Sequence, residues 1–255
     1  MRGRSMAHGG VLLLALALLL GLAGPARAAG PEVKVSPDLV EIGAFFQGEE
    51  IRVTGEIPGG AEAVVEVLGP ENTEHLMRKG RRGGLWMNVG EVEIKAAPSL
   101  YLARATQPEL LSAHASAAAF GFPALTRRMA ASGGTATAAE LEEFLKLKES
   151  EALYRILPQP LQVAAAADGK RLVKAAFQLP TQVKPGTYRV CLSILEAGRV
   201  SGWKCADLKV VMVGLPALSA GLAYEHGVLY GILAVIIAMA TGLVMGYLFR
   251  GGGGH

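Results

Sequence analysis

The feature that most constrains this chain is a run of uncharged residues from Gly227 to Phe249, in the last tenth of the sequence. As an α-helix, such a run extends about 34 Å, enough to cross a hydrocarbon core about 30 Å thick. A helix satisfies its own backbone hydrogen bonds within lipid, so the run predicts a transmembrane helix over 227–249. The alternative, a helix buried in a protein core, rarely lacks charge over so long a stretch.

Six small residues recur within this run at spacings of three and four: Gly227, Gly231, Ala234, Ala238, Gly242 and Gly246. On a helix they form one stripe, and membrane helices associate by close approach over small residues. The stripe predicts packing against a second copy of the chain or against a multi-span membrane partner. The alternative is that Gly and Ala are simply common in membrane spans.

The first 28 residues have the composition of a secretory signal peptide. Arg2 and Arg4 precede a short apolar run, and Ala26-Arg27-Ala28 offers a cleavage site of small residues. We expect the segment that follows to lie outside the cytoplasm, and an uncleaved anchor would place it there too. Arg250 follows the second apolar run, so residues 250–255 are expected to form a short cytoplasmic tail.

The charge of the chain mostly reflects this topology. Of 25 basic residues, Arg2, Arg4, Arg27 and Arg250 flank the two apolar segments, which leaves 21 basic against 22 acidic residues elsewhere. The exported part is therefore close to neutral. Its charge gives no reason to expect nucleic-acid binding.

Between the apolar segments, the pattern predicts a mainly β fold. Residues 29–97 and 161–214 contain short, apolar-rich runs separated by Gly and Pro, as in an antiparallel sandwich. Residues 98–160 are richer in Ala and Leu, with a capping box at Thr137-Ala-Ala-Glu140. We expect one immunoglobulin-like antiparallel β-sandwich with an all-helical insertion over 98–160. Two small sandwiches are the alternative, and 215–226 is expected to be a juxtamembrane linker.

The two cysteines of the chain lie in a predicted hairpin. A three-residue loop at 197–199 would place Cys191 directly opposite Cys205, at a cross-strand distance that permits a disulfide. Export from the cytoplasm would also allow the bond to persist. Two free thiols on one face of the sheet are the alternative.

No catalytic or metal-binding set is recognised in the sequence. His75, His114 and His226 are isolated, and the three aspartates, Asp38, Asp168 and Asp207, are expected near turns or strand ends. No zinc-protease, nucleophile-elbow or P-loop motif occurs. We therefore expect a non-enzymatic protein that needs no cofactor.

One basic segment stands out. Arg78, Lys79, Arg81 and Arg82 are interleaved with glycines and followed by Trp86. Exposed backbone N–H groups and guanidinium groups can hold a phosphate, a sulfate, a lipid head group or an acidic partner. The alternative is a solvated hairpin with scattered basic residues, in which Trp86 is either a core residue or an interfacial anchor.

Four segments follow one another in a fixed order: FFQGEEIRVTGEIP at 45–58, RKGRRGGLWMNVGEVEIKAAPSLY at 78–101, LPTQVKPGTYRVCLSILEAGRV at 179–200 and YGILAVIIAMATGLVMGYLFR at 230–250. Together they resemble one uncharacterised family of transmembrane proteins named from alphaproteobacteria (Alph_Pro_TM). The resemblance implies a bacterial envelope protein with one C-terminal span. It implies no activity.

These observations together suggest a bacterial inner-membrane protein whose N-terminal domain lies in the periplasm. We expect it to be an accessory or binding subunit of a membrane complex, such as a transporter complex. The alternatives are a protein that binds or senses anions or lipid head groups, and an envelope enzyme whose site the sequence does not reveal.

Overall fold

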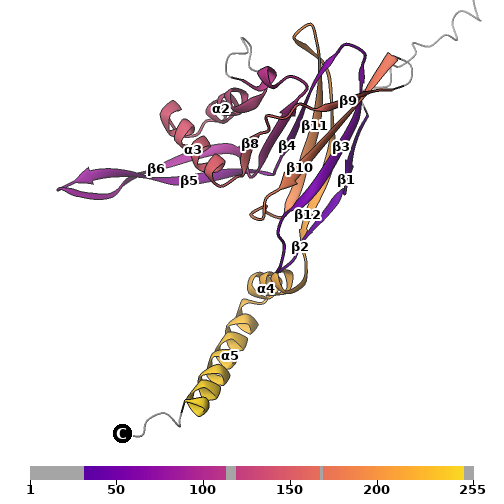
Figure 1. The fold of residues 1–255 in the computed structure, drawn as a ribbon. Coiled ribbons are helices and arrows are strands. Elements are labelled where there is room, and N and C mark those ends of the chain that lie inside the picture. Colours follow the sequence, from indigo (N-terminus) through magenta and orange to yellow (C-terminus); the bar gives the residue numbers. More distant parts are fainter. Residues whose placement is uncertain (1–31, 113–118, 167–168, 250–255) are drawn as a thin grey trace, which may run out of the picture. The chain divides into compact units, whose positions relative to one another are not determined.

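The computed structural model describes residues 32–112, 119–166 and 169–249 (Figure 1). The predicted signal peptide at 1–28 and the predicted tail at 250–255 lie outside these residues, as do His114 and Asp168.

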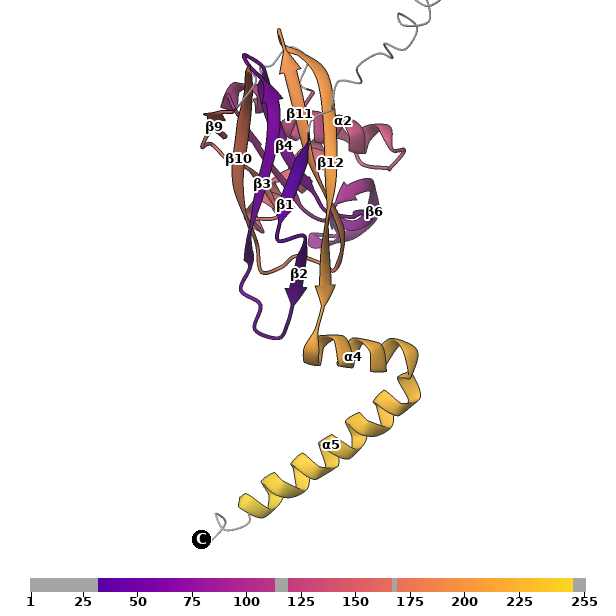
Figure 2. The ribbon, with the colours of Figure 1, turned by 90° about the vertical axis from the view of Figure 1, so that its right-hand side faces the viewer.

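Two sheets make up most of the fold, and they face each other in Figure 2. The four-stranded sheet has the order β1 (Val33–Ser36), β3 (Glu49–Pro58), β10 (Lys170–Leu179) and β9 (Gln162–Ala165). The six-stranded sheet has the order β2 (Leu39–Ile42), β12 (Arg199–Met212), β11 (Gly186–Glu196), β4 (Glu62–Leu68), β7 (Tyr101–Ala105) and β8 (Tyr154–Ile156). Strands from before and after the predicted insertion share both sheets, so two separate sandwiches do not describe this arrangement.

The core lies between the two sheets. Along β3, Ile51, Val53 and Ile57 are buried and alternate with exposed or half-buried residues, as expected for a strand with one apolar face. The sheets approach closely at Gly55, where a Cβ atom would lie 2.5 Å from Leu192 Cδ2 of β11. A side chain at this position would force Leu192 to move, so glycine suits the close approach.

Two pairs of strands depart from the predicted antiparallel arrangement. β2 runs parallel to β12, and β8 runs parallel to β7. A parallel pair needs a crossover connection, and here α2 (Gly121–Ala131) and α3 (Ala138–Ser150) lie in the connection between β7 and β8.

The prediction that 98–160 is all helical is wrong, because β7 and β8 lie within it. Tyr101–Ala105 is a short apolar run whose residues are nearly all buried, and such a run shows no period that separates strand from helix. Its pairing with β4, for example Leu102 opposite Val67, makes it a strand. The helix expected after Pro108 is the short η1 (Pro108–Leu111), and residues 113–118 are outside the described part.

Other predicted helical features are present. α3 begins at the predicted capping box, in which Glu140 N–H donates to Thr137 Oγ1 and Thr137 N–H donates to Glu140 Oε2. The expected linker at 215–226 is largely helical, as α4 (Gly214–Glu225). It is followed by α5 (Gly227–Leu248), which matches the predicted apolar helix to within one residue.

The hairpin formed by β11 and β12 has the predicted cysteine register through a different turn. The loop has two residues, Ala197 and Gly198, both with positive φ, rather than the expected three. A bulge at Ser201 adds one residue to β12, so Cys191 still lies directly opposite Cys205. The two sulfur atoms form a disulfide, with the Cα atoms 4.0 Å apart.

We predict that this disulfide forms under oxidising conditions and stabilises the protein. Replacing both Cys191 and Cys205 by Ser should lower the free energy of unfolding by about 2–3 kcal/mol, because the bond closes a short loop in the unfolded chain. Urea denaturation should show the same decrease in the free energy of unfolding, relative to oxidised wild type, for the variant and for reduced wild type. Alkylation of both cysteines in native, unreduced protein would show that the bond is absent.

Candidate functional site

A long two-stranded hairpin projects from the fold (Figure 1). Its strands, β5 (Glu71–Arg82) and β6 (Leu85–Pro98), pair only with each other among the described strands. The base of the hairpin is part of the core, since Val92, Ile94 and Ala97 are buried. The far end, residues 79–90, is exposed except for Gly80, and we call it the tip.

The base of the hairpin is held against the helices by paired hydrogen bonds. Glu93 N–H donates to Thr135 Oγ1 at 2.8 Å, and Thr135 N–H donates to the Glu93 carbonyl at 2.9 Å. Arg78 binds the Glu140 carboxylate, with a guanidinium nitrogen 2.6 Å from Oε1. The projecting part of the hairpin therefore begins after Arg78.

Glu140 has two structural tasks, since it caps α3 and also binds Arg78. The pKa of its carboxyl is lowered, first by the hydrogen bonds from the Thr137 backbone and side chain and then by Arg78. Arg78 is thus engaged by a helix cap and does not belong to an open anion site. This separates it from Lys79, Arg81 and Arg82, with which the sequence grouped it.

The tip is closed by a tight turn. Gly83 and Gly84 have φ values of 57° and 84°, and Arg82 lies directly opposite Leu85. Two consecutive positive φ angles define the turn that suits the twist of a two-residue hairpin, and glycine adopts them without strain. The turn sets the register of the pairs as far as Lys79 and Asn88, and beyond them a bulge at Val89 shifts the register by one residue.

That register gives the tip two different faces. Residues opposite each other in an antiparallel pair share a face, so Arg81 and Trp86 lie on one face, with Lys79 behind them. Leu85 and Met87 lie on the other face. Trp86 is 74% exposed and Leu85 is 68% exposed. Trp86 is therefore not a core residue, which removes one of its two predicted roles.

The tip is strongly basic. No acidic residue occurs between Leu76 and Gly90. Within the described residues, no ion pair is found for Lys79, Arg81 or Arg82, and Arg81 Nε donates a long hydrogen bond of 3.4 Å to the Gly84 carbonyl. The tip can thus offer several cations and exposed apolar side chains to an anionic surface, and it carries no carboxylate or imidazole side chain.

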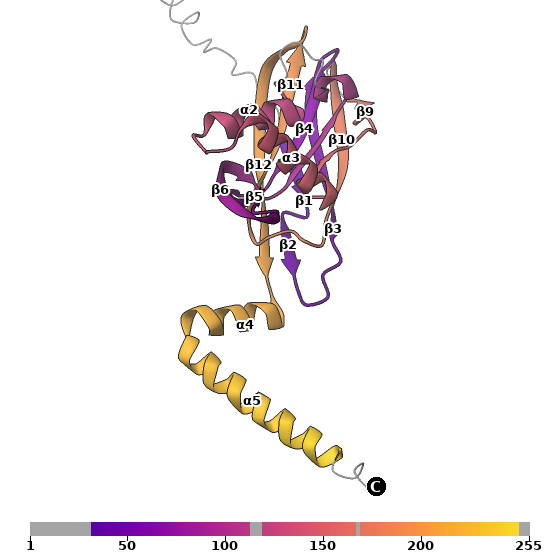
Figure 3. The same ribbon diagram turned by 90° about the vertical axis from the view of Figure 1, so that its left-hand side faces the viewer.

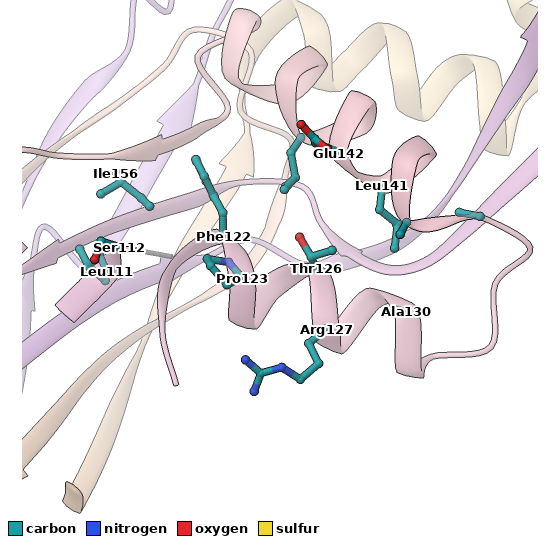
Figure 4. Close-up of a pocket in the computed structure, with 13 residues that line it drawn as sticks. Leu111, Ser112, Phe122, Pro123, Thr126, Arg127, Ala130, Leu141, Glu142 and Ile156 are labelled. Atoms are coloured by element: carbon teal, nitrogen blue, oxygen red, sulfur yellow. The ribbon is translucent and has the colours of Figure 1, made fainter. Parts of the chain in front are cut away.

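A second candidate is the groove between α2 and α3, about 690 Å³ in volume (Figure 4). Its walls are mostly apolar, with Phe122 and Thr126 from α2 facing Leu141 from α3. The size suits a small ligand. The lining also includes the polar residues Ser112, Thr126, Arg127 and Glu142. No group of three or more His, Cys, Asp and Glu side chains that could hold a metal ion is found among the described residues.

A third candidate is a polar contact beneath α2, which the sequence reasoning missed. Tyr101 of β7 donates its hydroxyl hydrogen to Glu66 Oε1 at 2.5 Å and accepts a hydrogen bond from Gly121 N–H at 3.0 Å. Burial raises the pKa of Glu66, against the opposing effects of Tyr101 and Arg128, and raises that of Tyr101 well above its ordinary value. The available signal was a lone glutamate in the otherwise apolar run Ala63–Leu68. We interpret the contact as structural because it joins β4, β7 and the start of α2.

The candidate membrane span is the remaining predicted site. Among the described helices, α5 is long and apolar enough to cross a bilayer. Of the six stripe residues, Ala234 and Ala238 line an apolar groove against α4, together with Leu218 and Leu222. A Cβ atom added at any of the four stripe glycines would meet no atom within 4 Å, so those positions are open.

These features define a class of protein: a mostly β domain followed in the chain by one candidate membrane-spanning helix. Residues 32–251 match the family described as "Putative transmembrane protein (Alph_Pro_TM)". The chain belongs to this family, as the resemblance of its four segments implied.

Other comparisons add little. A search of curated proteins gives no match. Among solved structures, the chain is similar to Spo0M, a sporulation control protein from Bacillus subtilis, with 10% identity and a TM-score of 0.28. The similarity covers 77% of this chain and 54% of Spo0M, so this chain matches only about half the length of that protein.

We predict that Tyr101→Phe lowers the free energy of unfolding by about 1–3 kcal/mol, because it leaves Glu66 and Gly121 N–H without their partner. Urea denaturation would measure the loss. A variant as stable as wild type would show that the contact contributes nothing.

Glu66→Gln is the matched control, since its amide oxygen can still accept from Tyr101. The pKa of Glu66 is higher in the folded than in the unfolded chain, so its favourable contribution is present at low pH and is lost as pH rises through the folded pKa. Glu66→Gln should therefore be at least as stable as wild type at neutral pH. It should also remove this part of the pH dependence, which lies above the ordinary pKa of a glutamate carboxyl.

Proposed function

We propose that this protein is a non-enzymatic binding module, an immunoglobulin-like β domain held outside the cytoplasm by a single span of the bacterial inner membrane. In this proposal the domain faces the periplasm and serves as an accessory subunit of a membrane complex, such as a transporter complex. The observation that carries the proposal is the tip of the β5–β6 hairpin, which exposes cations and large apolar side chains at the end of a firmly held ribbon.

The construction of the hairpin supports a binding role. Its base is buried, and it is joined to the α2–α3 connection through Glu93 and to α3 through Arg78, so the direction of the ribbon is set by the domain. Its tip exposes Leu85 and Trp86, side chains that ordinarily need a partner to leave water. A preorganised element of this kind loses little conformational freedom when it binds.

An enzymatic role is the second candidate, and the α2–α3 groove is where it would reside. Its volume suits a small ligand, but its lining contributes mainly methyl, methylene and aromatic groups. Apolar walls bind a ligand without activating it, so any chemistry in the groove would fall to its few polar residues, such as Glu142. We therefore favour the binding role.

We predict that the tip contacts another molecule in native membranes. A photoreactive residue replacing Met87 should give a product of increased mass, because this exposed side chain lies within the proposed contact. The matched control replaces Val200, which is similarly exposed at 46%, against 44% for Met87, and lies beside the β11–β12 turn. Equal yields of crosslinked product at Met87 and Val200 would show that the tip is not the binding surface.

We also predict that α5 associates with another helix through its stripe. Ala238→Ile and Gly242→Ile should weaken association measured by crosslinking in the membrane, because both side chains would hold the helices apart. Neither change should impair insertion, since both raise hydrophobicity. Leu229→Ile is the control and should behave as wild type. If all variants associate equally, α5 does not use this stripe.

A further inference from the structure

We propose that the partner of the hairpin tip is an anionic phospholipid bilayer, into whose head-group region Leu85, Trp86 and Met87 insert. This inference rests on the proposed function, since it takes the tip to be the binding surface. It names the chemistry of the partner from the distribution of charge and apolar area over the ribbon.

The two faces of the tip favour a bilayer over a protein. Trp86 lies on one face and Leu85 on the other, and both side chains are largely exposed. A flat protein surface could cover only one face of a two-stranded ribbon and would leave the other in water. A bilayer surrounds an inserted tip and covers both faces at once.

The length of the free part suits the interfacial layer. From Lys79 to the turn at Gly83 the ribbon extends about 14 Å, at roughly 3.4 Å per residue. The segment Leu85–Met87 takes up about the last 10 Å, which is close to the depth at which interfacial apolar groups are buried. The ion pair between Arg78 and Glu140 marks where the free part ends.

The basic residues lie where their side chains can reach lipid phosphates. Arg81 and Arg82 lie opposite Trp86 and Leu85, and Lys79 lies two pairs farther from the turn. Long basic side chains can reach outward to phosphate while their methylene groups stay beside apolar neighbours. Tryptophan is itself favoured at the membrane–water interface. The absence of acidic residues between Leu76 and Gly90 removes repulsion from an anionic leaflet.

The chain offers a direct optical test, because Trp86 and Trp203 are its two tryptophans. In full-length Trp203→Phe protein reconstituted into vesicles, the emission reports Trp86 alone. The vesicles contain phosphatidylcholine with or without phosphatidylglycerol, and brominated acyl chains serve as the quencher. We expect the Trp86 emission to lose most of its intensity in the anionic vesicles, to keep it in the neutral ones, and to recover as salt is added.

Three controls accompany the measurement. Trp86→Phe protein, which reports the exposed Trp203 of β12, should remain unquenched. Arg81→Glu/Arg82→Glu in the Trp203→Phe background should abolish the quenching while leaving the urea unfolding curve unchanged. Arg199→Glu reverses an exposed charge at the β11–β12 turn, and it should leave the quenching intact.

The outcomes separate this inference from the proposed function. Absence of quenching of Trp86 in anionic vesicles overturns the lipid inference, and equal quenching in neutral vesicles overturns its dependence on anionic lipid. If photocrosslinking at Met87 then gives a protein product, the tip is still a binding surface and the proposed function stands. If Met87 gives no product above the Val200 control, the lipid inference and the proposed function both fail.

Discussion

The structure depends on the pairing of strands from opposite ends of the domain. β3 pairs with β10 along its whole length, and β4 pairs with β11, so each sheet is closed by residues more than a hundred positions apart. The apolar faces of these four strands then meet across the core, where Gly55 of β3 lies close to Leu192 of β11. The chain must return after β9 to complete both sheets. The segment between β4 and β9 therefore lies beyond β4, at one edge of the six-stranded sheet.

The segment between β4 and β9 contains the two helices α2 and α3 and the hairpin of β5 and β6 (Figure 3). β7 and β8 extend the six-stranded sheet beyond β4, and α2 and α3 cover their outer surface through Tyr101, Phe144 and Tyr154. The hairpin of β5 and β6 has no place in either sheet. Its base packs on α2. Hydrogen bonds to Thr135 and Glu140 mark the boundary between this base and the projecting part of the hairpin.

Glu140 shows how a local motif acquires a long-range role. The capping box needs its carboxylate at the start of α3, and that position brings the same carboxylate within reach of Arg78. One residue therefore stabilises a helix end and orients the hairpin. The basic residues beyond Arg78 have no such partner among the described residues, and their exposure beside apolar side chains makes the tip the part of the domain best suited to contact another surface.

Local pattern was sufficient for the apolar helix α5, the capping box of α3 and the opposition of Cys191 and Cys205, because each depends on neighbours within one helix or one hairpin. The predicted loop length was wrong, but the predicted pairing of the cysteines is correct because the bulge at Ser201 adds the residue that the shorter loop lacks. Only the tertiary structure decided that Tyr101–Ala105 is a strand, that Glu66 binds Tyr101 and that Arg78 belongs to the base of the hairpin. Those outcomes depend on partners distant in sequence, and neither periodicity nor composition encodes which distant partner a residue will meet.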